Sequence, residues 1–138
     1  VKRPKLHIGD TGVACALLGL DAARLDADRS TFGPMLETFV LQELKRQASG
    51  REDHLAFHHF RDRDDFEVDI VLEDGGARLA GVEVKAAASV KEADLRGLRK
   101  LRAAAAKRFV AGVVLYDGEA TIAFGDGLFA VPVRTLWE

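Results

Sequence analysis

Alternation of apolar and polar residues is clearest in the middle of the chain, where it predicts two neighbouring strands. Over residues 66–73 every second position is apolar, which is the period of a strand with one buried face. A second alternating run spans residues 79–86, and an Asp-Gly-Gly turn at residues 74–76 joins the two. We therefore expect an antiparallel hairpin, with Asp69 and Ile70 on opposite faces of its first strand.

Apolar residues at helical spacing predict three helices around this hairpin. Asp10 is placed to cap a short helix that ends at Gly19. A longer helix is expected to begin at Gly33-Pro34 and to run to about residue 48. A capping box at residues 89–92 opens the third helix. The buried stripe of that helix consists of Leu95, Leu98 and Leu101.

Further apolar runs predict strands at residues 5–8, 55–60 and 109–116. A turn at Asp117-Gly118 leads into short apolar segments that continue to residue 133. The central order is then helix, three strands, helix, strand, with extra elements at both ends. This order predicts an α/β fold with a mixed sheet flanked by helices.

Length and composition favour one globular domain over residues 1–138. The 138 residues are 48% hydrophobic and carry a formal net charge of -2, so the bulk charge does not indicate nucleic-acid binding. We find no apolar run of the roughly 20 residues that span a bilayer, and no secretory signal. A single cysteine, Cys15, favours a reducing, cytoplasmic setting. The start without Met predicts a fragment of a longer protein.

The strongest candidates for metal-binding or catalytic residues are Asp69, Glu83 and Lys85, on the two strands of the hairpin. Glu83 and Lys85 are two apart and share a face, so two carboxylates and an ammonium come together. Carboxylates suit Mg²⁺ or Mn²⁺, and Lys85 could orient or deprotonate a water. Glu37, early on the preceding helix, could bind a second metal or order that water. The alternative is that Glu83 and Lys85 are solvated residues of an exposed face.

Gly33-x-x-x-Glu37, Asp69 and Glu83-Val84-Lys85 together resemble the signature of PD-(D/E)XK nucleases. More closely, three segments resemble the C-terminal domain found behind certain prokaryotic AAA+ ATPases: residues 4–12, 36–40 and 61–69. The resemblance implies a restriction-endonuclease-like core, α-β-β-β-α-β. It also implies metal binding by Asp69, Glu83 and Glu37, with Lys85 serving the nucleophile.

Two departures limit what this resemblance implies. Val68 stands where the superfamily name has proline, and no Gln-x-x-x-Tyr follows Lys85 as in RecB-like exonucleases. The implied function is a metal-dependent nuclease-type domain that binds DNA, or RNA, beside the ATPase region of the same protein. A non-catalytic module that regulates or assembles the ATPase is the alternative. Substrate specificity and oligomeric state stay open.

Basic residues are concentrated after Lys85, where eight Lys or Arg and two acids over residues 85–108 give a local charge of +6. Phosphate backbones are bound through such side chains. The candidates are Lys91, Arg96, Arg99, Lys100 and Arg102. The alternative is a solvated outer helix face.

Zinc and ATP are not expected ligands of this chain. His58 and His59 are adjacent and so point to opposite faces of a strand, and no Cys-His spacing of a zinc site occurs. No Gly-rich phosphate loop of the Walker type is found either. Glu43 falls within the apolar stripe of its helix, so we expect it to pair with a base or to join the site.

Overall fold

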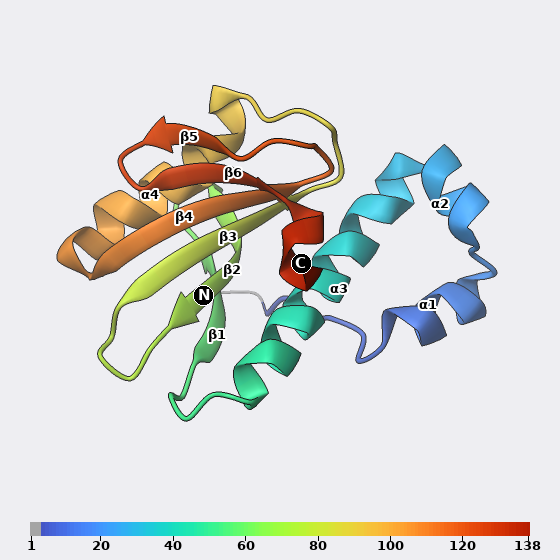
Figure 1. The fold of residues 1–138 in the computed structure, drawn as a ribbon, viewed down its shortest axis with the longest axis horizontal. Coiled ribbons are helices and arrows are strands. Elements are labelled where there is room, and N and C mark those ends of the chain that lie inside the picture. The colour runs from blue at the N-terminus through green and yellow to red at the C-terminus, as the bar shows by residue number, and fades with distance from the viewer. Residues whose placement is uncertain (1–3) are drawn as a thin grey trace.

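The fold is α/β and is built on one mixed sheet of six strands (Figure 1). The structure, a computed structural model, describes residues 4–138, so residues 1–3 of the predicted domain lie outside it. In spatial order the strands are β1 (Ala56–Arg61), β2 (Glu67–Glu73), β3 (Leu79–Lys85), β4 (Phe109–Tyr116), β6 (Leu128–Pro132) and β5 (Ile122–Gly125). The β1-β2-β3 and β5-β6 pairs are antiparallel, whereas β3, β4 and β6 run parallel.

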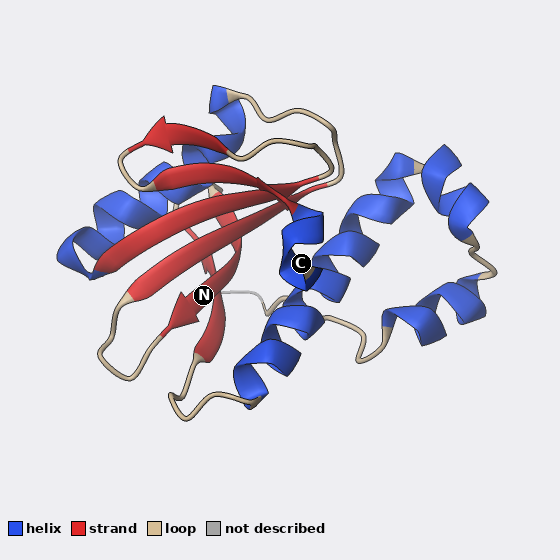
Figure 2. Cartoon of the chain, in the orientation of Figure 1, coloured by secondary structure: helices blue, strands red, loops and turns tan. Residues whose placement is uncertain are grey.

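Two helices cover the two faces of the sheet (Figure 2). On one face α3 (Arg29–Ser49) packs Leu36 and Val40 against Ile70, Val82 and Leu115. On the other face α4 (Arg96–Ala105) continues from the 3₁₀ turn η1 (Glu92–Leu95) and ends in η2 (Ala106–Arg108). As expected, its stripe of Leu95, Leu98 and Leu101 is buried. The central order of helix, three strands, helix, strand is present, and the C-terminal extras are β5, β6 and the turn η3 (Val133–Trp137).

The N-terminal segment agrees with the sequence in part. The Asp10 side chain caps α1 (Thr11–Leu18), and Gly19 ends it with a positive φ of 64°, as expected. The strand predicted over residues 5–8 is wrong, because this segment pairs with no strand and instead runs beside α3. There the Gln42 side chain donates a hydrogen bond to the Ile8 carbonyl. Helices α1 and α2 (Ala22–Ala27) extend away from the sheet (Figure 1). Among residues 4–138, no helix is both long and apolar enough to cross a membrane.

Helix α3 begins earlier than the sequence predicts. The expected start was Gly33-Pro34, but the helix starts at Arg29, where the Asp28 carboxylate accepts hydrogen bonds from the backbone N–H groups of Ser30 and Thr31. Because the helix starts at Arg29, Pro34 lies inside it, where its missing N–H leaves a gap in the backbone hydrogen bonding.

Replacing this proline should therefore stabilise the domain. In Pro34→Ala the new N–H can donate to the Ser30 carbonyl, while the unfolded chain regains some entropy. We expect a net gain of about 1–2 kcal/mol in the free energy of unfolding, measured by urea denaturation. A loss of stability would show that the Pro34 ring packs usefully against its surroundings.

The start of α4 was predicted from the wrong residues. The expected capping box over residues 89–92 is absent; the Asp94 carboxylate instead accepts a hydrogen bond from the Lys91 backbone N–H, 2.7 Å away. Gly97 follows in the first turn of α4, where a Cβ atom would lie 1.9 Å from the Glu67 carbonyl oxygen. The absence of a side chain at Gly97 thus lets α4 approach the beginning of β2 closely.

Candidate functional site

A β-bulge in β2 determines where the Asp69 side chain points. In the β1–β2 pair, Phe60 lies opposite Val68 and His58 lies opposite Val71, so His59 alone faces both Asp69 and Ile70. Val68 and Val71 belong to the core beneath α4, whereas Ile70 belongs to the core beneath α3. The extra residue thus turns Asp69 toward α3 together with Ile70, and the prediction that these two residues face opposite ways is wrong.

Asp69 also sits where the ladder between β2 and β3 stops. The paired residues run from Glu73 and Leu79 to Ile70 and Val82. Beyond that point the Asp69 Oδ2 atom accepts a hydrogen bond of 2.9 Å from the Val84 backbone N–H. A carboxylate therefore takes the place of the next backbone acceptor, and the chain opens a polar site at this edge of the pair.

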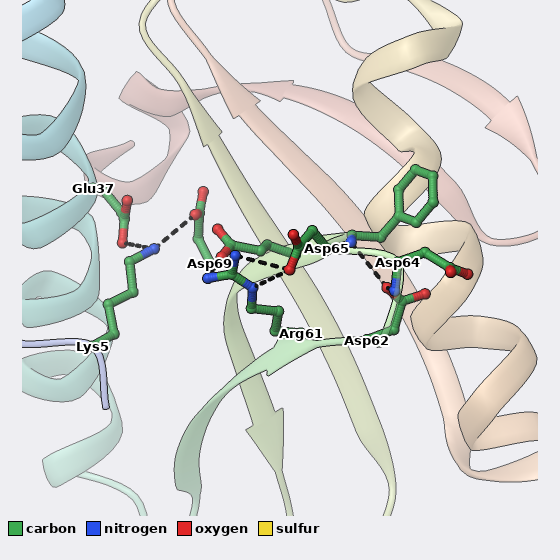
Figure 3. A network of polar contacts seen from close by, with 9 residues as sticks. Lys5, Glu37, Arg61, Asp62, Asp64, Asp65 and Asp69 are labelled. Atoms are coloured by element: carbon green, nitrogen blue, oxygen red, sulfur yellow. Dashed lines mark hydrogen bonds and ion pairs between the residues drawn. The ribbon is translucent and has the colours of Figure 1, made fainter. Parts of the chain in front are cut away.

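Lys5 joins Asp69 to Glu37 on α3 (Figure 3). The Lys5 Nζ atom lies 2.6 Å from Glu37 Oε1 and 3.0 Å from Asp69 Oδ1, and it donates a hydrogen bond to Asp69. Both carboxylates are largely buried, with side-chain exposures of 16% and 15%. Two acids that the sequence predicts to converge therefore do share a cation, but that cation is an ammonium of this chain.

Burial and neighbouring charges act in opposite directions at this ion bridge. Burial lowers the pKa of Lys5, but the adjacent Glu37 and Asp69 carboxylates outweigh it and hold that pKa above its usual value. Burial, together with the charges of Asp69 and Glu67, raises the pKa of Glu37 although Lys5 opposes the shift. The bridge is therefore an ammonium held among carboxylates that would repel one another without it.

Glu83 is the third acid of the site. Burial first, and then the neighbouring Asp69 carboxylate, raise the pKa of Glu83 to about 9. Its Oε1 atom also lies 2.8 Å from the point that a Cβ atom on Gly97 would occupy, so its carboxyl group reaches the start of α4. At neutral pH Glu83 is thus protonated beside an acid that takes part in the Lys5 bridge.

Lys85 does not join this group of acids. Its ammonium forms an ion pair with the Asp94 carboxylate, which also accepts the hydrogen bond from the Lys91 backbone. Although burial alone would raise the pKa of Asp94, the hydrogen bond from Lys85 holds it below its usual value. Lys85 therefore fixes η1 to β3, and the lysine nearest to Glu37 and Asp69 is Lys5 instead.

Glu37, Asp69 and Glu83 have the chemistry of a divalent-cation site. Carboxylate oxygens are the ligands that Mg²⁺ and Mn²⁺ prefer. Among the described residues, the buried Glu37 Oε1 atom lies 2.6 Å from Lys5 Nζ and 3.7 Å from His7 Nε2. In the described part of the chain, however, no three or more His, Cys, Asp or Glu side chains are grouped as a metal site. The carboxylate oxygens are thus of the kind that such a cation binds, but they are not arranged around one while Lys5 lies between Glu37 and Asp69.

A second set of charges borders the site on the β1–β2 loop. Figure 3 shows Arg61 beside Asp65; its guanidinium lies 2.9 Å from the Asp65 carboxylate and 2.9 Å from that of Glu67. In the same loop Asp62 accepts hydrogen bonds from the backbone N–H groups of Asp64 and Phe66. These acids are therefore occupied in holding the loop that leads into β2.

The basic residues of α4 are largely engaged in ion pairs. Lys100 lies 3.7 Å from Asp64 and 4.0 Å from Asp62. Arg102 lies 3.3 Å from Asp126, and Arg99 binds Glu92 at 2.8 Å. Contacts of these side chains, or of Lys91 and Arg96, with nucleic acid stay a prediction.

Three contacts of the site were not foreseen from the sequence. Lys5 and Asp94 give no local signal, since each acts through a partner on another element. His7, whose Nδ1 atom lies 2.9 Å from Thr38 Oγ1, was likewise not singled out. For Glu43 the sequence left two roles open, pairing with a base or joining the site. Its carboxylate accepts hydrogen bonds from Arg46 and Gln47 and does not join the site.

The comparisons with known proteins identify a family. A search of curated proteins and a search of solved structures found no match. The family model described as "Domain of unknown function (DUF4143)" matches residues 32–136, which include most of α3, the whole sheet and every acid of the site. Lys5 and His7 precede the matched segment. Because the match spans most of the chain, this protein belongs to the DUF4143 family.

Proposed function

We propose that the domain is a metal-dependent, nuclease-type module that binds DNA and hydrolyses its phosphodiester bonds. The observation that carries the proposal is the convergence of Glu37 Oε1 and Asp69 Oδ1 on one cationic group, 2.6 and 3.0 Å away. The protonated Glu83 beside Asp69 supplies a third oxygen ligand once it loses its proton. The order α3, β1, β2, β3, α4, β4 further supports a PD-(D/E)XK-type, restriction-endonuclease-like core.

In this proposal Asp69, Glu83 and Glu37 hold Mg²⁺ or Mn²⁺. Such an ion supplies a nucleophilic water at neutral pH and neutralises the charge that develops on phosphate oxygens. The residues of the chain have separate tasks. Asp69 keeps the end of β3 in place through the Val84 N–H, and Lys5, once released from the acids, is a cation beside the phosphate. Lys85 can serve the nucleophile only if Asp94 releases it.

A cleavage assay tests this proposal. The protein is incubated with single- and double-stranded DNA, and with RNA, in Mn²⁺, Mg²⁺ or EDTA. We expect metal-dependent cleavage that Asp69→Asn reduces at least a hundredfold, because the variant loses a charged ligand. Glu52→Gln removes an exposed carboxylate in the loop before β1 and should cleave normally. Cleavage that survives both Asp69→Asn and Lys85→Ala would reject the assignment.

A second function is favoured by the two lysines. Lys5 occupies the position between Glu37 and Asp69, and Asp94 holds Lys85. Both contacts suit a non-catalytic module, in which these ion pairs stabilise the fold instead of leaving the acids free to bind a metal. Such a module would regulate or assemble an ATPase region. Titration calorimetry separates the two functions: saturable Mn²⁺ binding that is lost in Glu83→Ala supports the enzyme, whereas absence of binding supports the module.

A further inference from the structure

A small pocket lies beside Asp69, between the N-terminal segment, α3 and β1. Its volume is about 160 Å³. The lining residues are Lys5, His7, Leu41, Lys45, Phe57, His58, His59 and Asp69. The bulge in β2 helps to form it, because His59 lies opposite the two residues of the bulge, one of which is Asp69.

Lysine and histidine side chains outnumber carboxylates around this pocket. Asp69 is the one carboxylate among its lining residues, against two lysines and three histidines. Asp69 and Glu37 already engage Lys5, whereas the exposed Lys45 has its ammonium 5.8 Å above the ring of Phe57. Lys45 and His59 are thus the groups that can meet an incoming anion.

His7 is a wall of this pocket rather than a ligand for an anion. Its Nδ1 atom lies 2.9 Å from Thr38 Oγ1, and its Nε2 atom lies 3.7 Å from Glu37 Oε1. Both ring nitrogens thus have partners within the fold, which leaves Lys45 and His59 of the lining residues to meet an anion.

The size of the pocket selects one phosphate rather than a nucleotide. Liquid water occupies about 30 Å³ per molecule, so 160 Å³ holds a few water molecules or one phosphoryl group. Pockets for drug-sized ligands measure roughly 300–1,000 Å³. Lys45 and His58 are exposed at the rim, which allows a longer chain to continue outside.

We propose that this pocket binds one backbone phosphate of a DNA strand, next to the carboxylates of the candidate metal site. The choice of DNA rests on the function proposed above; the anion site itself rests on the placement of Lys45 and His59 in the pocket. The bound phosphate lies at a position that neighbours Asp69, so the pocket sets which phosphodiester of the strand reaches the acids.

Fluorescence anisotropy with a labelled single-stranded oligonucleotide, in EDTA, tests the proposal without any cleavage. We expect Lys45→Gln and His59→Asn each to weaken binding about three- to tenfold. Lys45→Gln should also lower the slope of log K against log salt by about 0.7, the loss of one phosphate contact. Inorganic phosphate should compete with the oligonucleotide, and it should compete less well in both variants.

The matched control is Arg78→Ala, which removes one positive charge from the turn between β2 and β3. It should change binding less than twofold. Lys45 is exposed, so its variant is expected to fold, and circular dichroism checks this. The proposal is overturned if Lys45→Gln combined with His59→Asn binds DNA within twofold of the unchanged protein, or if the pocket takes up inorganic phosphate while the protein binds no oligonucleotide.

These outcomes separate the pocket from the proposed hydrolysis. A protein that binds DNA through Lys45 and His59 in EDTA but never cleaves it would refute hydrolysis and leave the phosphate site standing. A protein whose cleavage depends on Asp69, but whose binding ignores Lys45 and His59, would refute the phosphate site alone.

Discussion

Lys5→Met is expected to lower the stability of the domain by about 2–4 kcal/mol in EDTA. The substitution keeps most of the side chain but leaves the Glu37 and Asp69 carboxylates facing each other, both largely buried. Removing one partner of a buried ion pair typically costs about 3–5 kcal/mol, and the partial exposure of Lys5 reduces this figure. For a domain of this size we expect the melting temperature to fall by roughly 10 °C, measured by differential scanning fluorimetry.

Divalent cations should reverse this loss. In the unchanged protein an added ion must displace the Lys5 ammonium. In Lys5→Met no ammonium lies between the Glu37 and Asp69 carboxylates, so the ion has nothing to displace. Binding at a hundred times Kd stabilises the native state by about 2.7 kcal/mol. We therefore expect Mn²⁺ to raise the melting temperature of Lys5→Met more than that of the unchanged protein. Equal shifts in the two proteins would show that Lys5 and the metal do not compete for one position.

Lys107→Met is the matched control for this experiment. It removes the same ammonium from the exposed turn η2, after α4. Its melting temperature should stay close to that of the unchanged protein, with or without Mn²⁺. A large fall in this control would indicate that the loss in Lys5→Met reflects total charge rather than the bridge between Glu37 and Asp69.

The secondary structure of the central region was predictable because its signals are local. Alternation over residues 66–73 and 79–86 found β2 and β3, and leucine spacing found the buried stripe of α4. The run at residues 109–116 coincides with β4. Periodicity reports only which residues avoid water, so it found the strands but assigned Val68 and Ile70 to one face, whereas they pack on opposite faces of the sheet.

The details of the site were not predictable by the same means. No glycine or proline marks the bulge at Asp69 and Ile70, and its one trace in the sequence is the apolar Val71 between Ile70 and Leu72. The partner of Asp69 is Lys5, 64 residues away, so their meeting depends on how the N-terminal segment packs on α3. The sequence therefore indicated that Glu37 and Asp69 lie near each other, but not that the Lys5 ammonium lies between them.

The ion pair between Lys85 and Asp94 was not predictable for the same reason, because it joins residues of two different elements, β3 and η1. Glu-Val-Lys on β3 suggested that Lys85 would lie with Glu83 beside Asp69, because residues two apart in a strand share a face. Sharing a face sets the side of the sheet but not the partner. Asp94 lies on η1, within ion-pair distance of Lys85. An ionised carboxylate at that distance is a better partner for an ammonium than a protonated Glu83.

Glu83→Gln is expected to stabilise the domain in a manner that depends on pH. With a folded-state pKa of about 9 and an ordinary value of 4.5 when unfolded, Glu83 binds more protons in the native state between these two values. The stability that Glu83 contributes is fully present below pH 4.5 and is lost as pH rises toward 9. A neutral glutamine keeps the protonated form's shape and escapes this loss, so the gain of Glu83→Gln should grow from near zero at pH 4.5 to about 3 kcal/mol at pH 7.

Urea denaturation of both proteins from pH 4.5 to 9 measures this gain, with Glu52→Gln as a control whose exposed carboxylate should give no such trend. A constant difference across the range would mean that Glu83 is already ionised at neutral pH. Mn²⁺ adds a second expectation, because metal ligation requires the Glu83 carboxylate and releases its proton. Mn²⁺ should therefore stabilise the unchanged protein more at pH 8 than at pH 6, and should stabilise Glu83→Gln little at either. If Glu83 lowers the stability of the domain without Mn²⁺ and restores it when Mn²⁺ binds, then its carboxyl group serves metal binding rather than folding.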